Sequence, residues 1–167
     1  MTEAIIAHKL TKAYGRRRAL DGVSFDVPEG AFVSIFGPNG AGKSTLLRTL
    51  ATLTKPTGGT ATIHGFDIKE DPDRVRGSIG MISHRPMLYP DLTAFENLMF
   101  VARLYGIDDA EAQVRTMLAA VELDHRRFDA ARTFSRGMTQ RLSIARALLN
   151  DPPVVFLDEP YAGLDPH

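Results

Sequence analysis

The chain has 167 residues, and its 20 lysines and arginines balance 20 aspartates and glutamates, so its formal net charge is zero. That balance gives no global electrostatic reason to expect a nucleic-acid partner or an anionic membrane surface. The sequence has no cysteine, which excludes disulfides and thiolate chemistry within it. It shows neither an apolar run of the roughly 20 residues that a membrane span needs nor the pattern of a signal peptide, so we expect any link to a membrane to come through a partner.

The first sixty or so residues are predicted to be strands and turns, followed by one helix. Ile5–Ile6 opens a short strand, and the basic run Arg16–Arg18 is more typical of a solvated turn than of a functional basic patch, which is the alternative. Residues Val23–Val27 alternate apolar and polar side chains, which is the period of a half-buried strand. The apolar run Ala31–Phe36 ends at Gly-Pro-Asn-Gly and is predicted to be a buried strand that enters a loop. A helix is expected from Lys43 to about Leu53.

Two more strands are expected before the sequence changes to a helical character. They cover Thr60–Ile68 and Ile79–Ser83. Thr93 lies three residues before Glu96, which is the spacing of a capping box, and a helix is predicted over Phe95–Tyr105.

The remaining elements are two amphipathic helices and a strand. Asp108 and Glu111 repeat the capping spacing ahead of a helix whose predicted apolar stripe is Val114, Met117, Leu118 and Val121. Ser135 can cap a second helix, and one face of that helix is formed by Met138, Leu142, Ala145 and Leu149. The apolar run Val154–Leu157 then predicts a buried strand.

One segment matches the phosphate-binding pattern G-x-x-x-x-G-K-[ST] in full. It consists of Gly37, Pro38, Asn39, Gly40, Ala41, Gly42, Lys43 and Ser44, with Thr45 next in the predicted helix. Glycines let the backbone curl around an anion, and the start of the helix adds N–H donors and a positive dipole end. Lys43 can reach the β and γ phosphates, and the Ser44 hydroxyl can bind Mg²⁺. The pattern predicts a nucleoside triphosphate site.

A second candidate site element follows the strand Val154–Leu157, and it is acidic. Asp158 and Glu159 come directly after its four apolar residues, at the strand end where ligands of open α/β sheets bind. Asp158 can hold a Mg²⁺ ion, and Glu159 can accept a proton from an attacking water.

Two further stretches indicate a family. Phe134–Met138 precedes the acidic strand and Tyr161–Asp165 follows it. With the phosphate loop and the acidic strand, this ordered set resembles the ATP-binding subunits of ABC transporters over essentially the whole chain. The resemblance implies an α/β fold with a RecA-like P-loop NTPase core, an N-terminal antiparallel β region and an inserted helical subdomain.

The resemblance also implies roles for single residues. Tyr14 would stack on adenine, although a tyrosine packed into the core would look the same in sequence. Ser135 and Gly137 would belong to the signature that caps the ATP of a second subunit in a head-to-tail dimer, and Asp165 would communicate across that interface. A helix start with a hydroxyl and N–H groups is an anion site, which agrees with the signature role.

The chain departs from the family pattern in three places. Arg136 replaces a glycine of the signature, and His84 stands where the family carries a glutamine that contacts Mg²⁺ and the attacking water. The resemblance therefore makes His84 a candidate catalytic residue and Mg²⁺ ligand. A neutral imidazole is a poorer Mg²⁺ partner than a carbonyl oxygen. The family also carries a switch histidine on a later strand, and no residue up to and including His167 corresponds to it. The first two departures, together with the stretch LDEPYAGLD at 157–165, resemble the haem-exporter ATPase subunit of cytochrome c maturation and are similar as well to related bacterial exporter subunits.

These observations predict an ATPase that uses ATP and Mg²⁺ to power a membrane permease made by other chains. We expect a core at 1–87 and 147–167, with a helical subdomain at 88–146. The expected partners are a second ATP-binding subunit and permease subunits, without nucleic acid, and the expected place is the cytoplasmic face of the cell membrane. The alternatives are a truncated nucleotide-binding module with little turnover and a soluble ABC ATPase outside transport.

Overall fold

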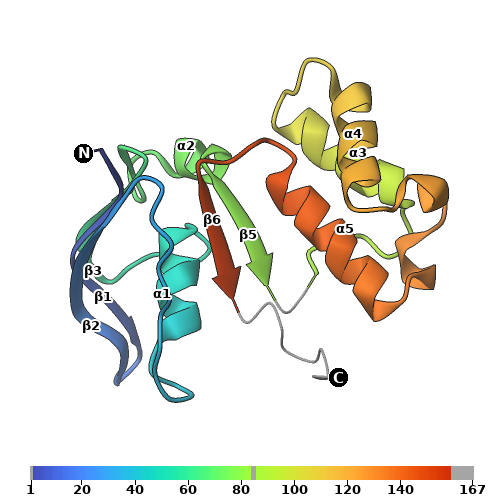
Figure 1. Ribbon diagram of the computed structural model, residues 1–167. Helices are drawn as coiled ribbons and strands as arrows, with labels where there is room; N and C mark the ends of the chain where they lie inside the picture. Colours follow the sequence, from blue (N-terminus) through green and yellow to red (C-terminus); the bar gives the residue numbers. More distant parts are fainter. Residues whose placement is uncertain (1, 84–85, 159–167) are drawn as a thin grey trace. The chain divides into compact units, whose positions relative to one another are not determined.

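The computed structural model describes residues 2–83 and 86–158. The chain divides into two compact units, Met1–Ile79 and Gly80–His167. The first unit contains an antiparallel sheet with two short helices, and the second contains three longer helices and a pair of strands (Figure 1). The mixed α/β fold with an N-terminal antiparallel region is the predicted one. The expected limits of a helical subdomain, 88–146, stay a prediction.

The sheet of the first unit has the strand order β2-β1-β3-β4, and every neighbouring pair is antiparallel. Its strands are β1 Glu3–Tyr14, β2 Arg17–Pro28, β3 Gly58–Ile63 and β4 Phe66–Asp67. The predicted alternation in β2 is confirmed, because Val27 is buried and the flanking Asp26 and Pro28 are exposed. Leu10 of β1 and Ile63 of β3 are fully buried and anchor one face of the sheet.

The single strand predicted over Thr60–Ile68 is wrong, because the chain turns in its middle. Strands β3 and β4 are joined by His64 and Gly65, whose φ angles are 47° and 82°. Two successive left-handed residues form the tight turn that suits the twist of antiparallel strands. Histidine followed by glycine was a weak turn signal, so the β-formers on both sides dominated the prediction.

Two short helices belong to the first unit. Helix α1 covers Lys43–Leu50 and packs against β2 and β3, so it starts where predicted. It ends three residues before the predicted Leu53, because Thr52 takes a left-handed φ of 60° that a helix cannot continue through. Helix α2, Pro72–Gly77, was not predicted and begins with a proline in its first turn.

The buried strand predicted at Ala31–Phe36 is wrong. These residues carry no strand pairing, and the side chains of Phe32 and Phe36 are 86% and 90% exposed. An apolar strand becomes buried only when neighbouring strands and covering side chains are present. None of the strands in the described part of the chain pairs with this segment.

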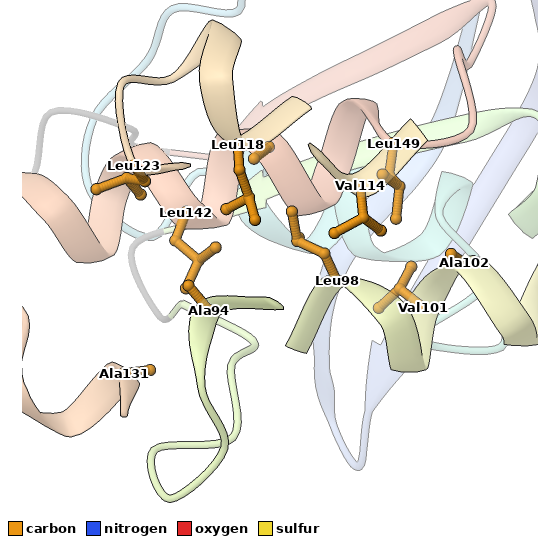
Figure 2. Close-up of a cluster of buried hydrophobic side chains, with 11 residues drawn as sticks. Ala94, Leu98, Val101, Ala102, Val114, Leu118, Leu123, Ala131, Leu142 and Leu149 are labelled. Carbon is orange, nitrogen blue, oxygen red and sulfur yellow. The ribbon is translucent and has the colours of Figure 1, made fainter. Parts of the chain in front are cut away.

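The second unit has a core formed by three helices. Helices α3 Ala94–Leu104, α4 Ala110–Ala120 and α5 Arg136–Leu148 meet around fully buried leucines, with the short 3₁₀ turns η1 Asp124–Arg126 and η2 Ala131–Thr133 between α4 and α5. Figure 2 shows Leu98, Leu118 and Leu142 from the three helices pointing toward one another. The two predicted apolar faces are confirmed by this cluster, since all of their residues belong to it or pack against it.

Side-chain caps fix where α3 and α4 begin. The predicted capping box is confirmed: the Glu96 N–H donates to the Thr93 hydroxyl at 3.1 Å, and the Glu96 carboxylate accepts from the Thr93 N–H at 2.8 Å. The backbone hydrogen bond from Thr93 holds the pKa of Glu96 below its ordinary value of 4.5. This contribution to stability is therefore present above about pH 4.5 and is lost as the pH falls. At α4 the cap is Asp109 and not Asp108, because the Asp109 carboxylate accepts from the Ala112 N–H.

Strands β5 Ile79–Ser83 and β6 Val154–Asp158 lie side by side and run in the same direction (Figure 1). The strand predicted at Val154–Leu157 is confirmed, but its burial alternates. Val154, Phe156 and Asp158 are buried, whereas Val155 and Leu157 are 41% and 43% exposed.

A buried asparagine on α3 fixes the loop that precedes this helix. The Asn97 side chain is 2% exposed, and its carbonyl accepts from the Tyr89 N–H at 2.8 Å. Its amide donates to the carbonyls of Tyr89, Leu92 and Thr93. One side chain therefore satisfies four backbone groups and ties the loop to the helix.

Thr93→Ala should lower the free energy of unfolding by about 1 kcal/mol, because the helix loses the side-chain acceptor for one of its first N–H groups. Urea denaturation followed by circular dichroism measures this change. Thr116→Ala is the matched control, because Thr116 is exposed in the middle of α4, where alanine has a higher helix propensity than threonine. Equal stabilities for the two variants would contradict the capping role.

Candidate functional site

The predicted phosphate loop lies in the first unit and leads directly into α1. Gly42 is the residue before the helix and has a left-handed backbone with φ 98°. No side chain caps this helix start, and its first turn carries no acidic residue. The first N–H groups of a helix have no partner within the helix, so this start is suited to an anion.

The Lys43 side chain lies against the loop backbone. Its ammonium donates to the carbonyl oxygens of Gly37 at 2.8 Å and Pro38 at 3.0 Å. Both acceptors are neutral, so the positive charge is not cancelled by these contacts. An ammonium has three N–H groups, and the third stays available for a phosphate oxygen.

Strand β2 supports the loop at two points that the sequence analysis missed. A Cβ atom at Gly42 would lie 2.3 Å from the Ala19 carbonyl oxygen, so only glycine allows this approach. The Arg17 guanidinium donates to the Gly40 carbonyl at 3.3 Å. Arg17 belongs to the basic run that sequence alone placed in a solvated turn. The position of Arg17 directly opposite Tyr14 in a tight hairpin indicates a role at the site more strongly than the basic run does.

Tyr14 ends β1 on the same unit, and its side chain is 52% exposed. That exposure excludes the alternative of a tyrosine packed into the core. The Lys12 ammonium lies 4.9 Å from the centre of the ring and also donates to the Lys55 carbonyl at 2.7 Å. The Tyr14 ring is therefore held by a cation–π contact and is accessible to a planar ligand.

The residues of the expected signature lie in the second unit, at the start of α5. Ser135 is the N-cap residue, and its hydroxyl oxygen accepts from the Met138 N–H at 3.3 Å. Its hydroxyl proton can still be donated to an anion. A Cβ atom at Gly137 would have no neighbour within 4 Å, so space is open beside the first turn of this helix.

Asp158 is the last residue of β6 and its side chain is only 4% exposed. Across residues 2–83 and 86–158, no group of three or more His, Cys, Asp or Glu side chains could hold a metal ion. Three predicted site residues, His84, Glu159 and Asp165, lie outside the described residues. The structure therefore places Tyr14 and the phosphate loop in one unit, and Ser135, Gly137 and Asp158 in the other.

An apolar surface lies on the second unit around α3. We call it the α3 patch; it comprises the exposed side chains of Met87, Tyr89, Phe100, Leu104 and Tyr105. The rings of Tyr89 and Phe100 meet edge to face with centres 5.3 Å apart. Burial lowers the pKa of the nearby Arg146, and electrostatic interaction with Tyr105 and Tyr89 acts in the opposite direction by raising this pKa.

Known proteins resemble this chain along almost its whole length. The daunorubicin/doxorubicin resistance ATP-binding protein of Streptomyces peucetius is 42% identical over 99% of this chain and 51% of its own length. The Nod factor export ATP-binding protein I of Ralstonia nicotianae is 38% identical over 99% of this chain and 52% of its own. The chain thus spans about half the length of these curated relatives. Their names refer to drug resistance and export, so the expected resemblance to a haem exporter gains no support.

A solved structure and a family model agree with these relatives. The structure of an ATP-binding subunit of an ABC transporter superposes with a TM-score of 0.87 at 34% identity and covers 98% of this chain and 69% of that one. No helix in the described part of the chain is long and apolar enough to cross a membrane. The model of the ABC transporter family matches residues 20–162. The chain belongs to the ABC transporter family.

Proposed function

We propose that this chain binds and hydrolyses ATP and that the energy drives export by a membrane permease. The phosphate loop is the observation that carries the proposal. It combines an uncapped helix start, a lysine held by neutral carbonyls and a glycine, Gly42, where β2 leaves no room for a side chain. Tyr14 stands exposed on the same unit and can stack on the adenine ring.

Magnesium suits the oxygen donors of the site. The Ser44 hydroxyl is a hard ligand of the kind that Mg²⁺ prefers, and triphosphate oxygens and water would contribute to its shell. The Asp158 carboxylate, which belongs to the second unit, stays a predicted Mg²⁺ ligand. The bound ion would neutralise charge that develops on the phosphate oxygens. Lys43 and the N–H groups at the start of α1 bind and orient the triphosphate. Glu159 would accept the proton of the attacking water as the bond to the γ-phosphoryl group breaks.

Because the chain belongs to this family, the proposal includes two partners. A second ATP-binding subunit would place the helix start at Ser135 and Gly137 against a nucleotide bound to the first. The α3 patch would receive a segment of the permease, because exposed apolar patches of this kind mark interaction sites. Export, rather than import, is favoured by the name of the Nod factor export relative.

Lys43→Ala should weaken ATP binding on the order of 100-fold, because it removes the charge that faces the β and γ phosphates. Isothermal titration calorimetry on the full-length protein measures this change. Arg48→Ala removes one positive charge from the exposed last turn of the same helix and should bind ATP like the wild type. An unchanged affinity in Lys43→Ala, with the fold intact, contradicts the proposed site.

Glu159→Gln separates binding from hydrolysis. The amide cannot accept the proton of the attacking water, so turnover should fall by at least about 100-fold while ATP affinity stays near that of the wild type. Phosphate release gives the turnover, and Glu111→Gln, an exposed carboxylate on α4, is the control. Near-normal turnover in Glu159→Gln means that another group acts as the base.

Leu104→Asp tests the α3 patch as the permease contact. A charge in an apolar interface carries a large desolvation cost, so the variant should no longer co-purify with its permease, while ATPase activity of the isolated subunit is retained. Phe128→Asp is the matched control, because Phe128 is 68% exposed and lies outside the patch. If both variants co-purify equally well with the permease, the patch is not the contact.

A further inference from the structure

Arg17 faces the same side of the sheet as Tyr14. The two residues are register partners at the end of the β1–β2 hairpin, separated only by the turn Gly15–Arg16. Side chains of directly opposed residues in antiparallel strands project to the same face. The hairpin therefore offers an aromatic ring and a guanidinium group from one face.

The guanidinium reaches the tip of the phosphate loop. One of its terminal nitrogens donates to the Gly40 carbonyl at 3.3 Å, and a Cβ atom at Gly40 would lie 3.2 Å from the same nitrogen. Two residues further along β2, the Ala19 carbonyl lies against Gly42. The strand thus contacts the loop at two places. The Arg17 side chain meets the tip of the loop, and the Ala19 backbone meets the loop where α1 starts.

The contact at Gly40 determines how the loop tip is oriented. The Gly40 carbonyl and the Ala41 N–H belong to one planar peptide, so holding the oxygen also fixes the direction of the N–H. That N–H donates to the Pro38 carbonyl at 3.2 Å, which closes the turn from Pro38 to Ala41. With Lys43 bound to Gly37 and Pro38, and Arg17 bound to Gly40, protein groups hold the loop at both ends of this turn.

The neighbouring arginine does not share this position. Arg18 forms an ion pair with Asp21 at 2.7 Å, and successive residues of a strand project to opposite faces. Arg17 has no ion pair in the described part of the chain, and the acceptor it does have is neutral. Its charge is therefore not cancelled where a polyanion would approach.

We infer that Arg17 is a positioning residue that holds the phosphate loop in the shape that accepts ATP. The inference rests on the proposed function, because it concerns the same nucleotide site. A loop that is already ordered loses less conformational entropy when the ligand binds, and this raises affinity. The residue acts through the Gly40 peptide rather than through contact with the nucleotide.

The test uses Arg17→Ala in the full-length protein with two readouts. ATP affinity, measured by calorimetry, should fall about fivefold, which is the effect of losing one intramolecular hydrogen bond. Without nucleotide, the amides of Asn39 to Gly42 should exchange hydrogen faster than in the wild type, because the loop is less restrained. Arg17→Lys should recover part of both effects, since lysine can donate one hydrogen bond to the carbonyl.

Arg18→Ala is the matched control, because it removes the same charge one residue away and should leave affinity and exchange unchanged. If Arg17→Ala and Arg18→Ala weaken binding equally, the effect is one of charge alone and the inference is overturned. Unchanged exchange in Arg17→Ala also overturns it, whether affinity falls or not. A wild-type protein that fails to bind ATP contradicts the proposed function instead, and the exchange experiment still decides the role of Arg17 because it requires no nucleotide.

Discussion

The close approach of β2 to the phosphate loop is the constraint on which the rest of the candidate site depends. The Ala19 carbonyl occupies the position where a side chain at residue 42 would begin, so the chain must turn into α1 through a glycine with a left-handed backbone. That turn aims the first N–H groups of the helix at the loop and brings Lys43 to the carbonyls of Gly37 and Pro38. The antiparallel sheet is therefore part of the nucleotide site and not only a support for it.

Patterns within a short stretch of sequence were sufficient to predict features that depend only on interactions within that stretch. The capping box at Thr93 and the apolar faces of α4 and α5 follow from spacing within one helix, and the structure confirms them. The turn at His64 and Gly65 was missed because few residues other than glycine adopt a positive φ, so the β-forming neighbours gave the stronger signal. Choosing Asp109 over Asp108 depends on backbone geometry that two adjacent aspartates cannot reveal.

The segment Ala31–Phe36 shows where local patterns are not enough. Its composition favours a strand, but a strand is formed by its neighbours, and none of the described strands pairs with it. For the site, two separate patterns in the sequence predicted the phosphate loop and Asp158, and these assignments stay predictions, whereas Arg17 lay in a basic run more typical of a solvated turn. Its role depends on contact between residues 17 and 40, which no pattern within a single element encodes.

The four hydrogen bonds of Asn97 have a mechanical consequence. The loop that carries Tyr89 cannot slide along α3 or bend away from it without breaking bonds in a buried place, so loop and helix behave as one lever. Moving Tyr89 without α3 would therefore break these bonds, and the packed leucines of the three-helix core hold α3 against α5.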